Sequence, residues 1–316
     1  LAGMRLADDT LSLTRNILFA IPAVGRNDPV VNHLGFYAGT FWTFFSLREL
    51  DDGMIEYKRS KTIGDAEGKR RAGARIVSGG IVSTASVAYL AGKFLNTYST
   101  PAAASTLFGA SNILFGVGSL LAIGASVLGA VRCHRFNKRL NEYLENPRLT
   151  EVQKLQGSLQ FLKDSITVTQ EERAELLLEI EQQHPDGTPD QKELLFKQKL
   201  ADLTEVKVKY MKRRTSNKSL QMIFTHADNL IAKLGDKNMR GITEASILIN
   251  TIQQESKIKM SLYMLGLIAS ILSFLGMVLM TFATVGALPF VLYGIAGTIY
   301  LIMTIYTMAG VLLKKE

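Results

Sequence analysis

Charged side chains are missing from two long stretches of this chain of 316 residues. Residues 94–131 contain no Asp, Glu, Lys or Arg, and residues 260–313 contain none either. The helices of a soluble domain carry a charged face opposite an apolar one, so stretches of this length exclude an ordinary soluble enzyme as the default interpretation. Intrinsic disorder is excluded as well, because it requires low hydrophobicity and 47% of these residues are hydrophobic.

Residues that carry out covalent or metal chemistry are also scarce. Cys133 is the only cysteine, so the chain can form neither an internal disulfide nor a thiolate metal cluster. The sequence has no phosphate-binding loop, no dinucleotide fingerprint and no nucleophile elbow. It has four histidines, none of them with a second ligand at metal-binding spacing: His33, His134, His184 and His226. We therefore predict a non-enzymatic protein without a metal or a cofactor.

Basic residues are in excess, with a formal net charge of +8, and many of them flank the uncharged stretches. Lysine and arginine beside apolar segments form the positive-inside pattern of membrane proteins. This placement argues against a nucleic-acid-binding surface, which would gather the same charge on one face of a soluble domain. The membrane-flanking basic residues are Arg70, Arg71, Arg75, Arg132, Arg135, Lys257, Lys259, Lys314 and Lys315.

Four helical spans fit the apolar stretches, each near the roughly 20 residues that a helix needs to cross a bilayer. A polar turn that ends at Pro101 separates the first two spans, and a break at Gly286 and Pro289 separates the last two. The sequence therefore predicts two transmembrane hairpins, with both termini on the same side of the membrane. No carboxylate lies inside a span, which argues against a transporter. The predicted spans are residues 76–95, 106–131, 260–284 and 288–313.

The region between the hairpins, residues 132–259, has the charge density of a soluble helical domain. We predict that it contains an antiparallel helical hairpin from 150 to 214 that turns near Gly187, because the segment 184–190 is rich in turn-forming residues. Further helices are expected at 220–234 and at 242–258, the second continuing into the third span. A coiled-coil seam precedes the turn, with apolar residues three and four apart: Val152, Leu155, Leu159, Leu162 and Ile166.

The first 75 residues are predicted to form a separate cytosolic or interfacial region. Their uncharged segment, residues 36–47, contains the only tryptophan but is too short to span a bilayer. Two positions remain open for it: the membrane interface, which favours Trp and Tyr, or the surface of the soluble part. The predicted organisation is an all-α membrane protein with an N-terminal region (1–75), a first hairpin (76–131), a helical soluble domain (132–259) and a second hairpin (260–313).

The hairpins resemble a known family. Each pairs two hydrophobic segments across a small uncharged loop, at residues 80–131 and 260–313, and every long segment falls on one side. This arrangement is similar to that of the chlamydial inclusion membrane proteins, and the basic run at 69–80 entering an apolar segment is similar to one such protein's entry sequence. The resemblance implies type III secretion and residence in the vacuole membrane, with the coiled-coil regions and both termini in the host cytosol. Two bilobed units depart from the commoner single unit.

We therefore expect an integral membrane protein that displays its helical domain to a protein partner or to a second copy. The expected partner-binding stripe is Leu159, Leu162, Phe196 and Leu203. Two alternatives stay open. The chain could be a pore-former or a type III secretion translocator that inserts its hairpins into a host membrane. The stripe could also be covered internally by the helices at 220–234 and 242–252.

Overall fold

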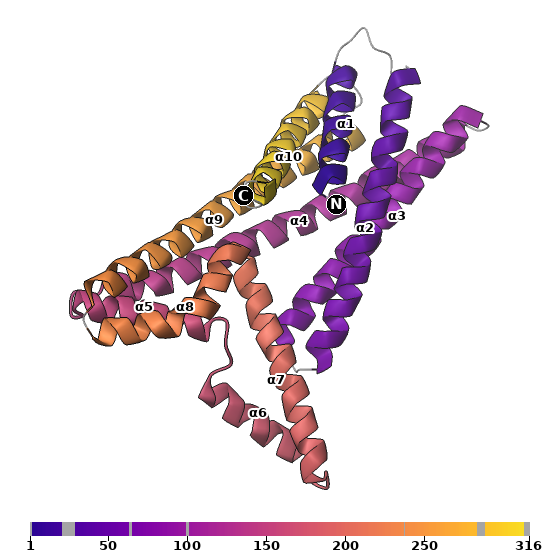
Figure 1. The fold of residues 1–316 in the computed structure, drawn as a ribbon. Helices are drawn as coiled ribbons and strands as arrows, with labels where there is room; N and C mark the ends of the chain where they lie inside the picture. The colour runs from indigo at the N-terminus through magenta and orange to yellow at the C-terminus, as the bar shows by residue number, and fades with distance from the viewer. Residues whose placement is uncertain are drawn as a thin grey trace. The chain divides into compact units, whose positions relative to one another are not determined.

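The computed structural model describes residues 2–20, 29–62, 65–98, 101–236, 238–282 and 288–312. All regular structure within these ranges is helical, which confirms the all-α prediction. The helices are drawn in Figure 1. They are α1 (Ala2–Ala20), α2 (Pro29–Thr62), α3 (Ala66–Tyr98), α4 (Pro101–Leu144), α5 (Glu151–Asp164), α6 (Gln170–Gln183), α7 (Pro189–Lys212), α8 (Asn217–Gly235), α9 (Met239–Phe282) and α10 (Leu288–Leu312).

Four of these helices are long and apolar enough to cross a membrane: α3, α4, α9 and α10. The predicted spans lie on these four helices wherever the structure describes them, and residues 283, 284 and 313 of the predicted spans lie outside the described residues. Only 17–28% of each membrane-length window is buried inside the chain. Apolar helices that the chain itself leaves uncovered need another apolar environment, which a bilayer provides.

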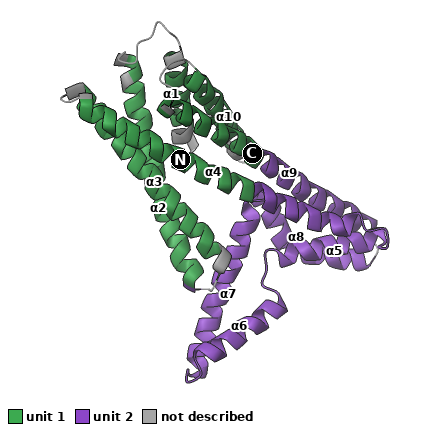
Figure 2. Ribbon diagram, turned by 180° about the vertical axis from the view of Figure 1, so that it is seen from behind, with its two compact units in different colours: residues 1–61, 65–128, 262–316 green, residues 62–64, 129–261 purple. Residues whose placement is uncertain are grey.

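The chain divides into two compact units, coloured separately in Figure 2. Unit 1 contains residues 1–61, 65–128 and 262–316, and unit 2 contains residues 62–64 and 129–261. Unit 2 coincides within a few residues with the soluble domain expected at 132–259. The structure differs from the sequence-based division at the other end of the chain, because residues 1–61 belong to the same unit as the four candidate spans.

Two helical hairpins in unit 1 are held together by hydroxyl groups. Ser111 Oγ on α4 donates a hydrogen bond to the backbone oxygen of Ala85 on α3, at 2.8 Å. The hydroxyls of Ser270 on α9 and Tyr300 on α10 lie 3.0 Å apart. Small hydroxyl side chains at such positions allow helices to approach closely and provide polar contacts in an apolar environment.

The two N-terminal helices pack along the candidate spans. Ser83 Oγ on α3 donates to Ser46 Oγ on α2 at 3.0 Å. Gly79 lies against the backbone of α2, where an added Cβ would come 2.8 Å from the nitrogen of Leu50. At the other edge of the unit, Thr304 Oγ1 on α10 donates to Asp9 Oδ2 on α1 at 2.6 Å. The sequence gives no signal for these pairings, because neither α1 nor α2 is apolar enough to be read as a span.

Unit 2 is a helical bundle built around one apolar core, to which the end of α4, helices α5 and α8 and the start of α9 contribute. Leu140, Leu159, Leu162, Leu234 and Ile249 are all completely buried there. Helix α8 contains the helix predicted at 220–234 and begins three residues earlier, and α9 runs without a break from the bundle into the third candidate span, as the sequence predicts.

The predicted long hairpin from 150 to 214 is interrupted in the structure. Helix α5 ends at Asp164, and a new helix, α6, begins after Thr169. The cause is local, since the Thr169 side chain accepts a hydrogen bond from the Glu172 backbone while the Glu172 carboxylate accepts one from the Thr169 backbone. This capping box starts a helix. The antiparallel hairpin is therefore α6–α7 alone, and it turns near Gly187 as predicted.

Candidate functional site

The most exposed part of unit 2 is the hairpin formed by α6 and α7, residues 170–212, which we call the arm. Both helices extend away from α5 and α8 (Figure 1), and the arm is joined to the bundle where α7 packs against α8. Its tip is a tight turn in which the Gly187 backbone N–H donates to the His184 oxygen at 3.2 Å. Thr188 then caps α7, and Pro189 at the first helical position fixes the helical backbone angle.

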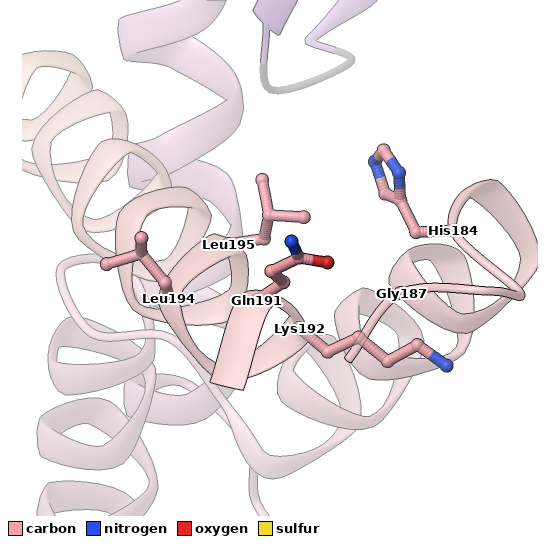
Figure 3. Close-up of a pocket in the computed structure, with 6 residues that line it drawn as sticks. All are labelled: His184, Gly187, Gln191, Lys192, Leu194 and Leu195. Carbon is pink, nitrogen blue, oxygen red and sulfur yellow. The ribbon is translucent and has the colours of Figure 1, made fainter. Parts of the chain in front are cut away.

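A small depression of about 250 Å³ lies at this tip (Figure 3). Lys192, one of its lining residues, donates to the Pro185 oxygen at 3.3 Å and so helps to hold the turn. His184 supplies the only imidazole of the lining, and no carboxylate, hydroxyl or thiol side chain lines the depression with it. The depression is therefore part of the turn, and its chemistry does not suggest a catalytic site.

A buried lysine holds the two helices of the arm together. Lys199 on α7 is 8% exposed, and its ammonium group donates to Glu179 Oε1 at 3.0 Å and to Gln183 Oε1 at 3.2 Å, both on α6. Leu176 and Ile180 supply the apolar part of the same contact and are also buried. A buried cation that is paired in this way makes the relative position of the helices specific, because any slip leaves the charge unpaired.

Lys207 fastens the base of the arm. Its ammonium group donates to the backbone oxygens of Asp164 at 2.9 Å and Thr167 at 2.8 Å, and to the carboxylate of Glu172. Burial raises the pKa of the Glu172 carboxyl, but the hydrogen bonds from Lys207 and from the Thr169 backbone outweigh this effect and lower the pKa below its ordinary value. Glu172 is therefore charged at neutral pH, and α7 is tied to the start of α6.

Apolar side chains on the outside of the arm are not used in these contacts. Leu177 and Leu178 on α6 are 48% and 58% exposed, and Leu194 on α7 is 58% exposed. Single exposed leucines are ordinary on a protein surface. Here they sit on a projecting hairpin that is already stabilised by other residues, so they are available for contact with another molecule.

The structure separates the four residues of the predicted partner-binding stripe. Leu159 and Leu162 on α5 are completely buried in the core of unit 2, facing α8. Phe196 and Leu203 lie on α7 and are half-buried. Leu159 and Leu162 are therefore covered internally by the helices at 220–234 and 242–252. This is the alternative that the sequence left open. The exposed leucines of the arm were not part of the predicted stripe, because α6 shows no clean apolar periodicity.

The membrane-flanking basic residues occupy several environments. Arg75 on α3 pairs with three carboxylates of α2, at 2.8 Å from Glu49, 3.5 Å from Asp52 and 2.9 Å from Glu56. Glu56 is 8% exposed, so Arg75 neutralises a buried charge in addition to any role at the membrane surface. Of the remainder, Arg70, Arg135 and Lys257 are exposed, Arg71, Arg132 and Lys259 are half-buried, and Lys314 and Lys315 lie outside the described residues.

Groups that could hold a metal are not found in the described parts of the chain, where no three His, Cys, Asp or Glu side chains come close enough together. Cys133 is 1% exposed. Comparisons of the chain with protein-family models, with curated proteins and with solved structures found no match.

Proposed function

We propose that this chain is a non-enzymatic integral membrane protein that displays the arm of unit 2 to a helical protein partner or to a second copy of itself. The membrane location is supported by one observation, the exposure of the four apolar helices. The chain buries at most 28% of the membrane-length window of any of them. A soluble protein rarely exposes so much contiguous apolar surface.

The partner-binding part is supported by the construction of the arm. Its helices are joined by the buried Lys199 contact, so the arm does not need a partner to hold its shape. Its outward leucines, at positions 177, 178 and 194, are of the kind that helix-to-helix recognition uses as anchors. A preorganised surface binds with a smaller loss of conformational entropy than a segment that must first fold.

The proposed location is a membrane with unit 2 and both termini on one side. Four spans are an even number, and the basic residues flank the same ends of the apolar stretches. The finer location, a host vacuole membrane reached by type III secretion, is supported by the resemblance of the hairpins to those of the chlamydial inclusion membrane proteins.

Self-association of the full chain in liposomes tests the arm. In the triple variant Leu177→Ser, Leu178→Ser, Leu194→Ser, we expect energy transfer between labelled copies to require an at least tenfold higher protein concentration. The matched control is Phe224→Ser, which removes a large apolar side chain of similar exposure (48%) from α8 of the same unit. Equal association of the triple variant and the control would exclude the arm as the self-recognition surface.

The membrane part is tested separately by extraction. An integral protein stays in the membrane pellet after washing with alkaline carbonate and requires detergent for release. Release into the carbonate supernatant would contradict the proposal. Leakage of an encapsulated dye from the same liposomes, at protein concentrations where the chain is inserted, would instead favour the pore-former or translocator.

A further inference from the structure

A groove of about 710 Å³ lies in unit 2 between the last three turns of α4 and the part of α9 that approaches Met260. The two helices run side by side there (Figure 2), and Gln253 Nε2 on α9 donates a hydrogen bond to Asn141 Oδ1 on α4. We call this cavity the interhelical groove. All of its lining residues belong to unit 2.

The charges that line the groove are sorted along its length. Lys257 and Lys138 lie near its Met260 end, whereas Glu142 and Glu145 lie further along α4. Since an α-helix rises about 1.5 Å per residue, the carboxylates follow Lys138 by about 6 Å and about 10 Å along the axis. The groove therefore offers a cationic half and an anionic half, separated by a distance that suits one small zwitterionic group.

These charges do not neutralise one another. Lys138 and Glu142 are four residues apart on one helix, which is the spacing of an intrahelical ion pair, yet they form none. Within the described residues, Lys257 also has no carboxylate partner. Glu145 accepts a single hydrogen bond, from Asn141 Nδ2 at 2.8 Å. Both ends of the groove keep capacity for a ligand of the opposite charge.

Asn137 provides an independent indication of a ligand. Its side chain lines the cationic half, is only 8% exposed, and has no hydrogen-bond partner for either its Nδ2 or its Oδ1. The large majority of buried polar side-chain atoms in proteins are hydrogen-bonded, because a buried amide without a partner is destabilising. A bound oxygen-rich group that accepts from Nδ2 would remove part of this cost.

The position of the groove indicates where such a group would come from. Met260 is the first residue of the second uncharged stretch, and the first stretch ends at Val131, three residues before the lining residue His134. Helices α4 and α9 both continue through these points. If these helices cross a bilayer, the Met260 end of the groove opens at the level of the lipid headgroups.

We propose that the interhelical groove binds the headgroup of phosphatidylethanolamine, entering from the bilayer. The lipid phosphate lies between Lys138, Lys257 and the Asn137 amide, and the ammonium group donates to Glu142 and Glu145. This inference rests on the membrane location proposed above.

The lining discriminates against choline and against purely anionic headgroups. A choline group has no N–H to donate and is usually recognised by the rings of Trp, Tyr or Phe, none of which lines the groove. A purely anionic headgroup, or free inorganic phosphate, would be repelled by the two carboxylates. Phosphoethanolamine satisfies both halves of the groove, because it carries a phosphate and a hydrogen-bonding cation joined by a short linker.

Lipid retention by the detergent-purified full chain tests the proposal. Native mass spectrometry would compare phosphatidylethanolamine, phosphatidylcholine and phosphatidylglycerol at equal concentration, and phosphatidylethanolamine should be retained at least tenfold better than either. The double variant Lys138→Met, Lys257→Met should lose this retention, whereas the matched control Arg135→Met, on an exposed α4 cation outside the lining, should keep it. Equal retention of the three lipids, or an unchanged double variant, would overturn the proposal.

Two further variants separate binding from folding. The variant Glu142→Gln, Glu145→Gln should remove the preference, so that phosphatidylglycerol is retained as well as phosphatidylethanolamine. The variant Asn137→Leu should raise the melting temperature of the lipid-free chain, since it removes an unpaired buried amide, and should abolish the stabilisation that added phosphatidylethanolamine gives. A lower melting temperature with lipid stabilisation intact would show that Asn137 has a purely structural role and would contradict the assignment.

Competition with inorganic phosphate distinguishes the two sources of the anion. Displacement of the lipid by millimolar phosphate would mean that the groove is a free-phosphate site and would refute lipid recognition. Failure of the membrane location gives a different pattern, since the chain would then leave membranes in alkaline carbonate. A chain that stays in the membrane and retains all three lipids equally disproves the headgroup assignment alone.

Discussion

The interior position of Leu159 leads to a quantitative prediction for unit 2. Its side chain is 0% exposed and belongs to the core cluster shared by α4, α5, α8 and α9. Leu159→Ala removes buried methyl and methylene groups and leaves a cavity, which typically costs about 2–5 kcal/mol. The matched control is Leu178→Ala on α6, where the same side chain is 58% exposed and its truncation should change stability by less than about 0.5 kcal/mol.

Amide hydrogen exchange of the full chain in detergent measures this difference helix by helix. Because each 1.4 kcal/mol corresponds to a factor of ten, protection in α5 and α8 should fall by about 30-fold to several thousand-fold in Leu159→Ala. The control should leave the same amides unchanged. If Leu159 were an exposed docking residue, its truncation would spare α5 protection and weaken partner binding. Equal protection in the two variants would refute the packing described here.

Three further perturbations test the contacts that position the helices. Arg75→Met should destabilise the α2–α3 pair by about 2 kcal/mol, measured by proteolysis in urea, because it removes the charged hydrogen bond that Arg75 donates to the buried Glu56 carboxylate of α2; Arg70→Met, on an exposed neighbour, is the control. Gly79→Leu should make α2 accessible to protease, since its Cβ would meet the α2 backbone at 2.8 Å, and unchanged resistance would contradict the close approach. The pKa of Glu172 is lower in the folded chain than its ordinary value of 4.5, so its contribution to the free energy of unfolding is present above that pH and is lost as the pH falls below it. Hydrogen exchange in α6 should therefore accelerate as the pH falls through this range. Lys207→Met should remove the pH dependence.

Much of the fold can be read from the sequence, because hydropathy and turn chemistry act locally. The uncharged stretches identify the four candidate spans, and Pro101 marks the start of the helix that carries the second. The turn at Gly187 is also predicted locally, since Thr188 caps the next helix and Pro189 begins it. These local features can be predicted without knowing which helices pack against one another.

The partner of each helix cannot be read in this way. The spacing of Leu159 and Leu162 shows that one face of α5 is apolar, but the same spacing serves an internal core and a docking surface equally well. Only the packing of α5 on α8 decides between them. In the arm, a charged residue is misleading in the opposite way. Lys199 is buried between the two helices, whereas a lysine in a charged helix is normally interpreted as solvent-exposed.

The N-terminal helices change what the uncharged spans imply. In the sequence, α10 carries no carboxylate, and a span without a carboxylate is not typical of a transporter. In the structure, Asp9 of α1 accepts a hydrogen bond from Thr304, and Asp8 beside it is 5% exposed. A carboxylate can thus reach the surface of a candidate span from a helix that is not itself a span. The absence of carboxylates therefore describes the spans taken singly, whereas the unit that they form with α1 does contain them.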